Sequence, residues 1–158
     1  MVKRKWTVYA FWIVLCELVG IVSGLLSREG IAIYNATVSK PAFTPPAWVF
    51  PVVWTILFAL MGISAARVSL SEPSKARSWG LNTFIAQLVV NFFWPLFFFN
   101  VQAFGFAFIW LILLWILVAF TLLQFWRVDQ TAAWLLVPYL AWLTFAAVLN
   151  AAVWLMNS

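Results

Sequence analysis

The side chains able to carry polar chemistry are few in this sequence. It has no histidine, and its one cysteine, Cys16, lies inside a long apolar run. The four acidic residues are far apart in the chain: Glu17, Glu29, Glu72 and Asp129. This composition excludes Ser-His-Asp and Cys-His nucleophiles, zinc sites and disulfides, and no carboxylate pair is evident for acid–base or hard-metal chemistry. We therefore expect no metal site, no required cofactor and no conventional catalytic residue.

Aromatic and amide side chains are the residues that could bind a ligand instead. Residues 40–55, "KPAFTPPAWVFPVVWT", hold four of the seven prolines and two of the twelve tryptophans. Trp54 and Phe58 lie one helical turn apart and share a helix face, as do Gln87 and Asn91 in a later apolar run. Flat aromatic faces can stack on a flat ligand while amides orient it. Hydrogen bonding between helices is the alternative role for the two amides.

The elements that must position these residues are helices in a membrane. The 158-residue chain is 66% hydrophobic and 8% charged, with a mean hydropathy of +1.04, and so few charges could not cover a soluble domain of this size. Long apolar runs without alternation argue against a β-barrel. We expect an all-α membrane protein, one domain over residues 1–158, folded as a bundle of five transmembrane helices. The expected spans are roughly 6–26, 47–68, 79–99, 103–126 and 132–156.

The connection between the first two spans, residues 27–46, is long enough to be functional. Thr44 can cap the second span, with Pro45 and Pro46 in its first two positions, where proline is tolerated. Pro51 lies one turn further and should delete a backbone hydrogen bond and bend the helix. A bend beneath a long loop predicts a cavity near that membrane surface, lined by aromatic side chains of the second span.

The basic residues predict the orientation. Seven of the nine lie on the N-terminal side of the spans: Lys3, Arg4, Lys5, Arg67, Lys75, Arg77 and Arg127. By the positive-inside rule the N-terminus faces the cytoplasm and the first loop lies outside. We expect a multi-pass protein of a bacterial cell membrane, whose first apolar run stays as a helix rather than being cleaved as a signal peptide. The net charge of +5 indicates contact with anionic membrane lipid, not nucleic acid.

Three segments resemble one protein family. "KPAFTPPAWVFPVVWTILFALMGISAARV" (40–68) resembles the signature of the translocator proteins, also called tryptophan-rich sensory proteins or peripheral benzodiazepine receptors. "AQLVVNFFWPLFFF" (86–99) resembles the family's third-span pattern of Gln, Asn and Trp followed by Pro, and "LLVPYLAWLTFAAVLN" (135–150) resembles its fifth-span pattern. Three ordered matches in three helices make the resemblance specific, and it points to a bacterial member.

This resemblance implies a five-helix bundle, often a homodimer, with an apolar pocket beneath the first loop. Family members bind porphyrins and other tetrapyrroles, and isoquinoline-type and benzodiazepine-type drugs, so porphyrin would be a ligand here. The implied function is a receptor that senses, sequesters or transports such molecules. The alternative is an enzyme in which Trp54 and Trp142 assist light- or oxygen-dependent porphyrin breakdown. The implied ligand-binding residues are Tyr34, Pro45, Phe50, Trp54, Phe58, Gln87, Asn91, Trp94, Trp142, Ala146 and Leu149.

The sequence departs from the family pattern in two places. The first loop reads "IYNATVSKP", with Ile33 where the family usually has Trp and with one extra residue, so the surroundings of Tyr34 differ. The family's cholesterol-recognition motif needs Tyr and then Lys or Arg after the "LN" of the fifth span. The chain reads "VLNAAVWLMNS" there and has neither, so we expect no sterol site of that kind.

Two features of the first span also carry predictions. Glu17 lies mid-span with no basic residue in the membrane to pair with. We expect it to be protonated or hydrogen-bonded inside the bundle as a polar anchor, with a ligand contact or proton sensing as alternatives. The Gly20-x-x-x-Gly24 pattern predicts close approach of another helix.

Overall fold

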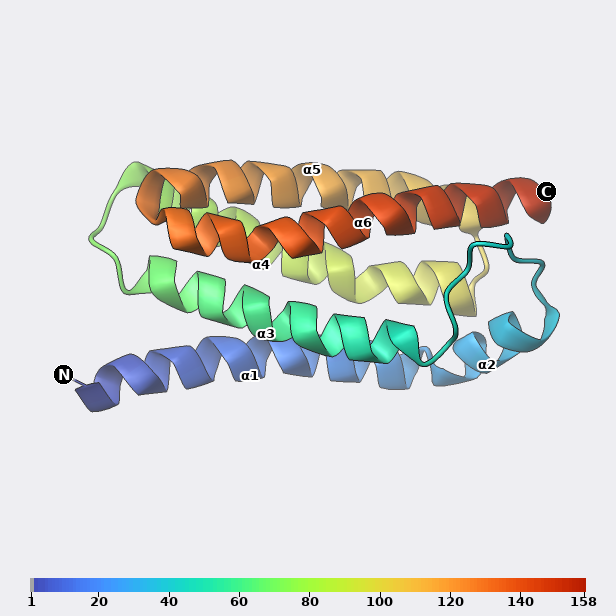
Figure 1. Cartoon of the computed structure of the whole chain (residues 1–158), viewed down its shortest axis with the longest axis horizontal. Coiled ribbons are helices and arrows are strands. Elements are labelled where there is room, and N and C mark those ends of the chain that lie inside the picture. The colour runs from blue at the N-terminus through green and yellow to red at the C-terminus, as the bar shows by residue number, and fades with distance from the viewer. Residues whose placement is uncertain (1) are drawn as a thin grey trace.

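The computed structural model describes residues 2–158, and five of its helices are long and apolar enough to cross a membrane (Figure 1). The prediction of an all-α membrane bundle is therefore confirmed. The largest boundary difference is at the third span, which begins at Lys75 and was expected to begin at residue 79. The spanning helices are α1 (Val2–Leu26), α3 (Val49–Ser69), α4 (Lys75–Pro95) with the π-helical turn η1 (Leu96–Asn100), α5 (Phe104–Val128) and α6 (Gln130–Met156).

The helices form a closed ring around the core. Helix α1 packs on α3, α3 on α6, α6 on α5 and α5 on α4, while a looser contact between α4 and α1 completes the ring. Two glycines allow α1 and α3 to meet closely. A Cβ at Gly62 would lie 2.5 Å from Cα of Ile13, and one at Gly20 would lie 2.5 Å from Cε2 of Phe58. The predicted close approach is thus right at Gly20 and wrong at Gly24, whose Cβ would have no neighbour within 4 Å.

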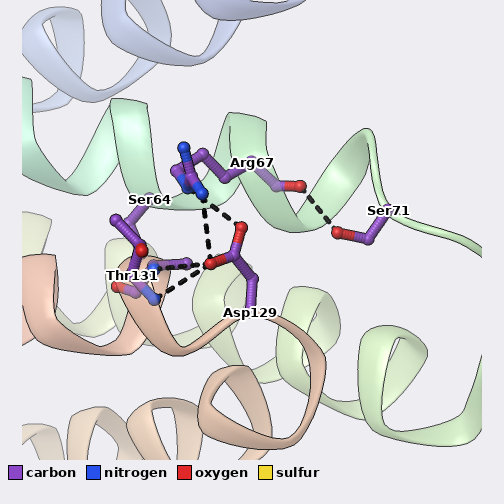
Figure 2. Close-up of polar contacts among 6 residues, drawn as sticks. Ser64, Arg67, Ser71, Asp129 and Thr131 are labelled. Atoms are coloured by element: carbon purple, nitrogen blue, oxygen red, sulfur yellow. Dashed lines mark hydrogen bonds and ion pairs between the residues drawn. The ribbon is translucent and has the colours of Figure 1, made fainter.

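One carboxylate both starts α6 and ties it to α3. Oδ1 of Asp129 accepts hydrogen bonds from the backbone N–H groups of Thr131 and Ala132 at 2.9 and 3.3 Å, which is an N-cap arrangement. Its Oδ2 lies 2.9 Å from Nε of Arg67 in α3 (Figure 2). Ser64, one turn before Arg67, donates its hydroxyl to the carbonyl of Ala132 at 2.7 Å. These contacts fix the end of the bundle that lies away from the first loop.

The first connection is partly helical, which the sequence analysis did not anticipate. Helix α2 (Arg28–Thr37) follows α1 almost directly, and an irregular stretch then leads to α3. Helix α3 begins at Val49, so Pro45 and Pro46 precede it. The hydroxyl of Thr44 donates to the carbonyl of Pro41 at 2.7 Å. The predicted cap at Thr44 is therefore wrong, and so is the placement of the two prolines inside the helix.

The later start of α3 changes the role of Pro51. As the third residue of the helix, it lies in the first turn, where a backbone N–H has no acceptor within the helix. Pro51 therefore deletes no hydrogen bond, and the predicted cause of a bend at this residue is wrong. The irregular backbone lies instead at the end of α4, where Pro95 is followed by the wider π-helical turn Leu96–Asn100.

Candidate ligand-binding site

A cavity of about 700 Å³ lies beneath α2, at the end of the bundle where the first loop is found. Its volume is within the range of small-molecule sites. Four of the spanning helices and α2 contribute to its wall, and most of the lining is apolar. The lining residues are Glu17, Gly20, Ile21, Ser23, Gly24, Leu25, Ile31, Tyr34, Asn35, Ala47, Trp48, Phe50, Pro51, Trp54, Thr55, Phe58, Asn91, Trp94, Pro95, Phe98, Phe99, Trp142, Ala146, Leu149 and Asn150.

Aromatic rings from α3 and α6 form one wall of the cavity. Trp54 and Phe58, one turn apart on α3, have ring centroids 5.5 Å apart and planes inclined by 31°. Nearer the mouth, the ring of Phe50 meets that of Trp142 edge-on, with centroids 5.8 Å apart. Phe58 is almost fully buried, whereas Trp54 and Trp142 are partly exposed. The two tryptophans therefore present ring surface that a ligand can cover.

The opposite wall comes from the end of α4 and from η1. The rings of Trp94 and Phe98 are stacked, with centroids 4.9 Å apart and planes inclined by 23°. The π-helical turn adds a residue to the helical repeat, and this register brings both Phe98 and Phe99 to the cavity. The wall is thus built where the α-helical pattern is broken.

Tyr34 of α2 closes the site from the loop side. Its ring is 6% exposed and packs against Phe98 and Phe99 with centroid distances of 5.2 and 5.1 Å. The ammonium group of Lys40 lies 4.9 Å from the centroid of the same ring. Burial raises the pKa of the Tyr34 phenol to about 12. The phenol is therefore neutral at physiological pH, although a cation lies over its ring.

A directed chain of hydrogen bonds lies behind the cavity wall. Nε2 of Gln87 lies 3.8 Å from the sulfur of Met61, which can only accept. Oε1 of Gln87 therefore faces Tyr139, whose hydroxyl donates to it at 2.6 Å. With its proton used, Tyr139 accepts from Nδ2 of Asn91, also at 2.6 Å. Oδ1 of Asn91 keeps its acceptor capacity, and Asn91 lines the cavity.

Asn150 is a second amide in the lining, and it serves the bundle. Its Oδ1 accepts from the indole N–H of Trp94 at 3.2 Å, and its Nδ2 donates to the carbonyl of Phe104 at 2.9 Å. These bonds join α6 to α4 and α5 and hold the Trp94 ring in position. Asn150 itself is 1% exposed. Of the two amides in the lining, Asn91 therefore has the greater capacity to bond a ligand.

Glu17 lies in the cavity lining on α1 and is half-buried. Within residues 2–158 its carboxyl group makes no ion pair or side-chain hydrogen bond. The predicted hydrogen bond to another helix is therefore wrong for the described part of the chain. Of the expected alternatives, a position facing the ligand space is the one that agrees with the geometry.

The structure gathers most of the residues that the family resemblance pointed to. Nine of them line the cavity: Tyr34, Phe50, Trp54, Phe58, Asn91, Trp94, Trp142, Ala146 and Leu149. Gln87 lies behind Asn91, is 1% exposed and is held by Met61 and Tyr139. Pro45 lies in the loop before α3 and is not among the lining residues. Gln87 and Pro45 thus lie outside the ligand space itself.

Several lining residues were not expected from the sequence. Ser23 and Gly24 lie on α1, where Ser23 donates its hydroxyl to the carbonyl of Phe92 on α4 at 2.7 Å. Phe98 reaches the cavity through the π-helical register, for which the sequence has no local signal. Asn150 could have been found, because it lies four residues after Ala146 and so on the same face of α6.

No group of three or more His, Cys, Asp or Glu side chains that could hold a metal ion is found in residues 2–158. Cys16 is fully buried and unpaired in the core. The chemistry available in the cavity is therefore aromatic stacking, apolar burial, one amide acceptor and one carboxyl group.

Comparison with known sequences agrees with this architecture. Residues 12–155 match the profile of the TspO/MBR family. The chain belongs to this family. It is 36% identical over 152 residues to the protein CrtK of Rhodobacter capsulatus, a match that covers 96% of this chain and 93% of that protein. It is 38% identical over 149 residues to the tryptophan-rich protein TspO of Chlorobaculum tepidum, with 94% of each chain covered.

The family also includes animal proteins that this chain resembles. It is 37% identical over 131 residues to the translocator protein of Ovis aries, which covers 82% of this chain and 77% of the relative. The names of these TspO/MBR relatives support the identification as a tryptophan-rich membrane protein of the translocator type. With five helices that can span a bilayer, the chain is a multi-pass integral membrane protein.

Proposed function

We propose that this protein binds porphyrins and similar flat, largely apolar molecules in the cavity beneath α2, as a membrane receptor that senses, sequesters or transports them. The carrying observation is the 700 Å³ cavity walled by aromatic rings of α3, α6 and the end of α4. Apolar burial and stacking supply affinity for a flat ligand, and the few polar groups orient it. Drug-like isoquinolines and benzodiazepines fit the same description.

A cavity-filling substitution tests this proposal directly. A side chain added at Gly24 would extend into open space, because a Cβ there has no neighbour within 4 Å. Gly24→Leu should therefore fold normally and reduce the room for a ligand. We expect weaker binding of protoporphyrin IX to the purified variant, measured by quenching of tryptophan fluorescence. Ile109→Phe on α5 is the control, since Ile109 is 66% exposed and lies outside the cavity lining.

The outcomes separate the possible readings. Absence of protoporphyrin binding by the unchanged protein would refute the proposed function. Equal binding by the unchanged protein and Gly24→Leu would show that the ligand sits elsewhere. Recovery of intact porphyrin after binding is the expected result for a receptor. Irreversible loss of porphyrin absorbance under light would instead favour the breakdown reaction assisted by Trp54 and Trp142.

We also propose an orientation in which the N-terminus faces the cytoplasm and α2 lies outside. The excess of basic residues at the end of the bundle that carries the N-terminus supports this orientation by the positive-inside rule. The cavity then opens toward the outer leaflet, so ligands would be received from that side of a bacterial cell membrane.

A further inference from the structure

A second cavity lies on the bundle surface, between the start of α4 and the end of α5. It has a volume of about 330 Å³. None of its lining residues lines the central cavity, and it lies near the opposite end of the bundle from α2. We call it the basic cleft, and it is lined by Lys75, Ala76, Trp79, Phe120, Gln124 and Arg127.

The cleft carries two positive charges that the described residues leave without a counter-charge. Lys75 comes from α4 and Arg127 from α5, and no carboxylate is among the lining residues. The one ion pair found in residues 2–158 joins Arg67 to Asp129. The neighbouring Arg77 is committed elsewhere, because its guanidinium donates to the carbonyls of Val68 and Ser69 at 3.2 and 2.7 Å. The cleft is thus built to attract an anion.

The position of the two charges matches the membrane boundary. Lys75 is the first residue of the span Lys75–Asn100, and Arg127 is the last but one of the span Phe104–Val128. Because these spans are antiparallel, both charges lie at the same boundary, where the phosphates of lipid headgroups are found. A guanidinium can bond a phosphate with two parallel N–H groups, while an ammonium serves as a point charge.

The apolar part of the cleft lies on the bilayer side of these charges. Trp79 and Phe120, each about one turn or two further into the span, meet edge-on with centroids 6.5 Å apart. They are 59% and 39% exposed, so much of their surface remains free for contact. Ile116, one turn further along α5, is 55% exposed. A molecule with a phosphate head and an acyl tail would cover both parts at once.

We infer that the basic cleft binds the phosphate of an anionic phospholipid, with the glycerol and upper acyl chain against Trp79 and Phe120. The two cations favour a lipid with net negative charge over a zwitterionic one, in which choline or ethanolamine neutralises the phosphate. The aromatic wall favours a lipid over free phosphate. This site is separate from the ligand cavity, so lipid bound there does not compete with a porphyrin.

Native mass spectrometry of the full chain in a neutral detergent tests this inference. The probes are dioctanoyl phosphatidylglycerol and dioctanoyl phosphatidylcholine, which differ in net charge. We expect the unchanged protein to prefer phosphatidylglycerol, and the double variant Lys75→Gln/Arg127→Gln to lose about tenfold or more of that affinity. The control Arg4→Gln/Lys5→Gln removes the same charge at exposed positions near the same end of the bundle, outside the cleft. It should keep the preference.

Further arms keep the test decisive. The exchange Lys75→Arg/Arg127→Lys retains both charges and should retain binding, which guards against misfolding as the cause of any loss. An equal loss in the Arg4/Lys5 control would overturn the inference, because general surface charge would then explain the preference. Unchanged affinity in the Lys75/Arg127 variant would also overturn it. Displacement of the lipid by millimolar inorganic phosphate would show a site for a soluble anion instead.

Discussion

The hydroxyl of Tyr139 donates its proton to Oε1 of Gln87 over 2.6 Å, in the buried centre of the bundle. This bond leaves Tyr139 as an acceptor toward Asn91 and so sets the direction of the whole chain from Asn91 to Met61. The two amides were predicted either to contact a ligand or to bond between helices. Asn91 can do both, whereas Gln87 is used entirely inside the bundle.

Removal of this hydroxyl should destabilise the protein. Tyr139→Phe leaves the buried Nδ2 of Asn91 and Oε1 of Gln87 without a partner, which we expect to cost about 1–3 kcal/mol of unfolding free energy. Unfolding in mixed detergent micelles would measure it. Tyr34→Phe is the matched control, because within residues 2–158 the Tyr34 hydroxyl makes no side-chain hydrogen bond. Equal losses in both variants would contradict the role given to the chain.

Trp54 and Trp142 should carry much of the porphyrin affinity. Replacing either by Ala removes a stacking surface in the cavity wall, and we expect binding to weaken by about 1–3 kcal/mol. Trp110 lies outside the cavity lining, with its indole N–H bonded to the carbonyl of Val90. Trp110→Ala should therefore have little effect on binding. Fluorescence titrations that gave the same loss at all three positions would refute the assignment of the walls.

Metal-free protoporphyrin should bind at least as tightly as haem. Iron ligands in proteins are usually His, Cys, Met or Tyr, and the chain has no histidine. Cys16 and Met61 are fully buried outside the cavity lining. The raised pKa of Tyr34, about 12, keeps its phenol protonated at neutral pH, so the phenolate needed to bind iron forms only as the pH approaches that value.

Absorption spectroscopy would check this expectation between pH 6 and 9. Bound haem should show no protein-derived axial ligand anywhere in that range, and Tyr34→Phe should leave the spectrum unchanged. A six-coordinate, low-spin spectrum that disappears on mutation of a single residue would contradict recognition by shape alone.

The two functions of Asp129 should be separable by mutation. Asp129→Asn keeps an N-cap oxygen but loses the charge facing Arg67, whose side chain is 36% exposed, so the cost should be at most about 1 kcal/mol. Asp129→Ala also removes the cap and should cost roughly 1 kcal/mol more. The ranking of unfolding midpoints, with Ala below Asn, checks this assignment. Identical midpoints would show that the cap contributes nothing.

Cysteine labelling in intact bacterial cells should report the orientation. Ala36 lies on the exposed part of α2 near Val38, and Ser74 is exposed at the start of α4. A membrane-impermeant maleimide should label Ala36→Cys and leave Ser74→Cys unmodified until the cells are opened. The native Cys16 is fully buried and should add no background. The reverse labelling pattern would overturn the orientation predicted from the basic residues.

The sequence by itself determined the five spans and their approximate limits. Hydropathy is a sum over local residues, and a bilayer requires each span to satisfy its own backbone hydrogen bonds. Side chains one turn apart on a single helix, such as Trp54 and Phe58, could be paired for the same reason, since the repeat of an α-helix is known before the fold. The apolar, aromatic character of the site followed from these local patterns and from the family resemblance.

Tertiary structure decided what depends on contacts between distant segments. The start of α3 at Val49, the helix α2 in the first connection and the π-helical turn after Pro95 depend on how the loop and helix ends pack, so proline positions alone misplaced the cap and the bend. Whether an amide faces the cavity or a neighbouring helix depends on partners 26 to 52 residues away, as for Gln87 with Met61 and Tyr139. The basic cleft likewise exists only because antiparallel packing brings Lys75 and Arg127 to the same membrane boundary.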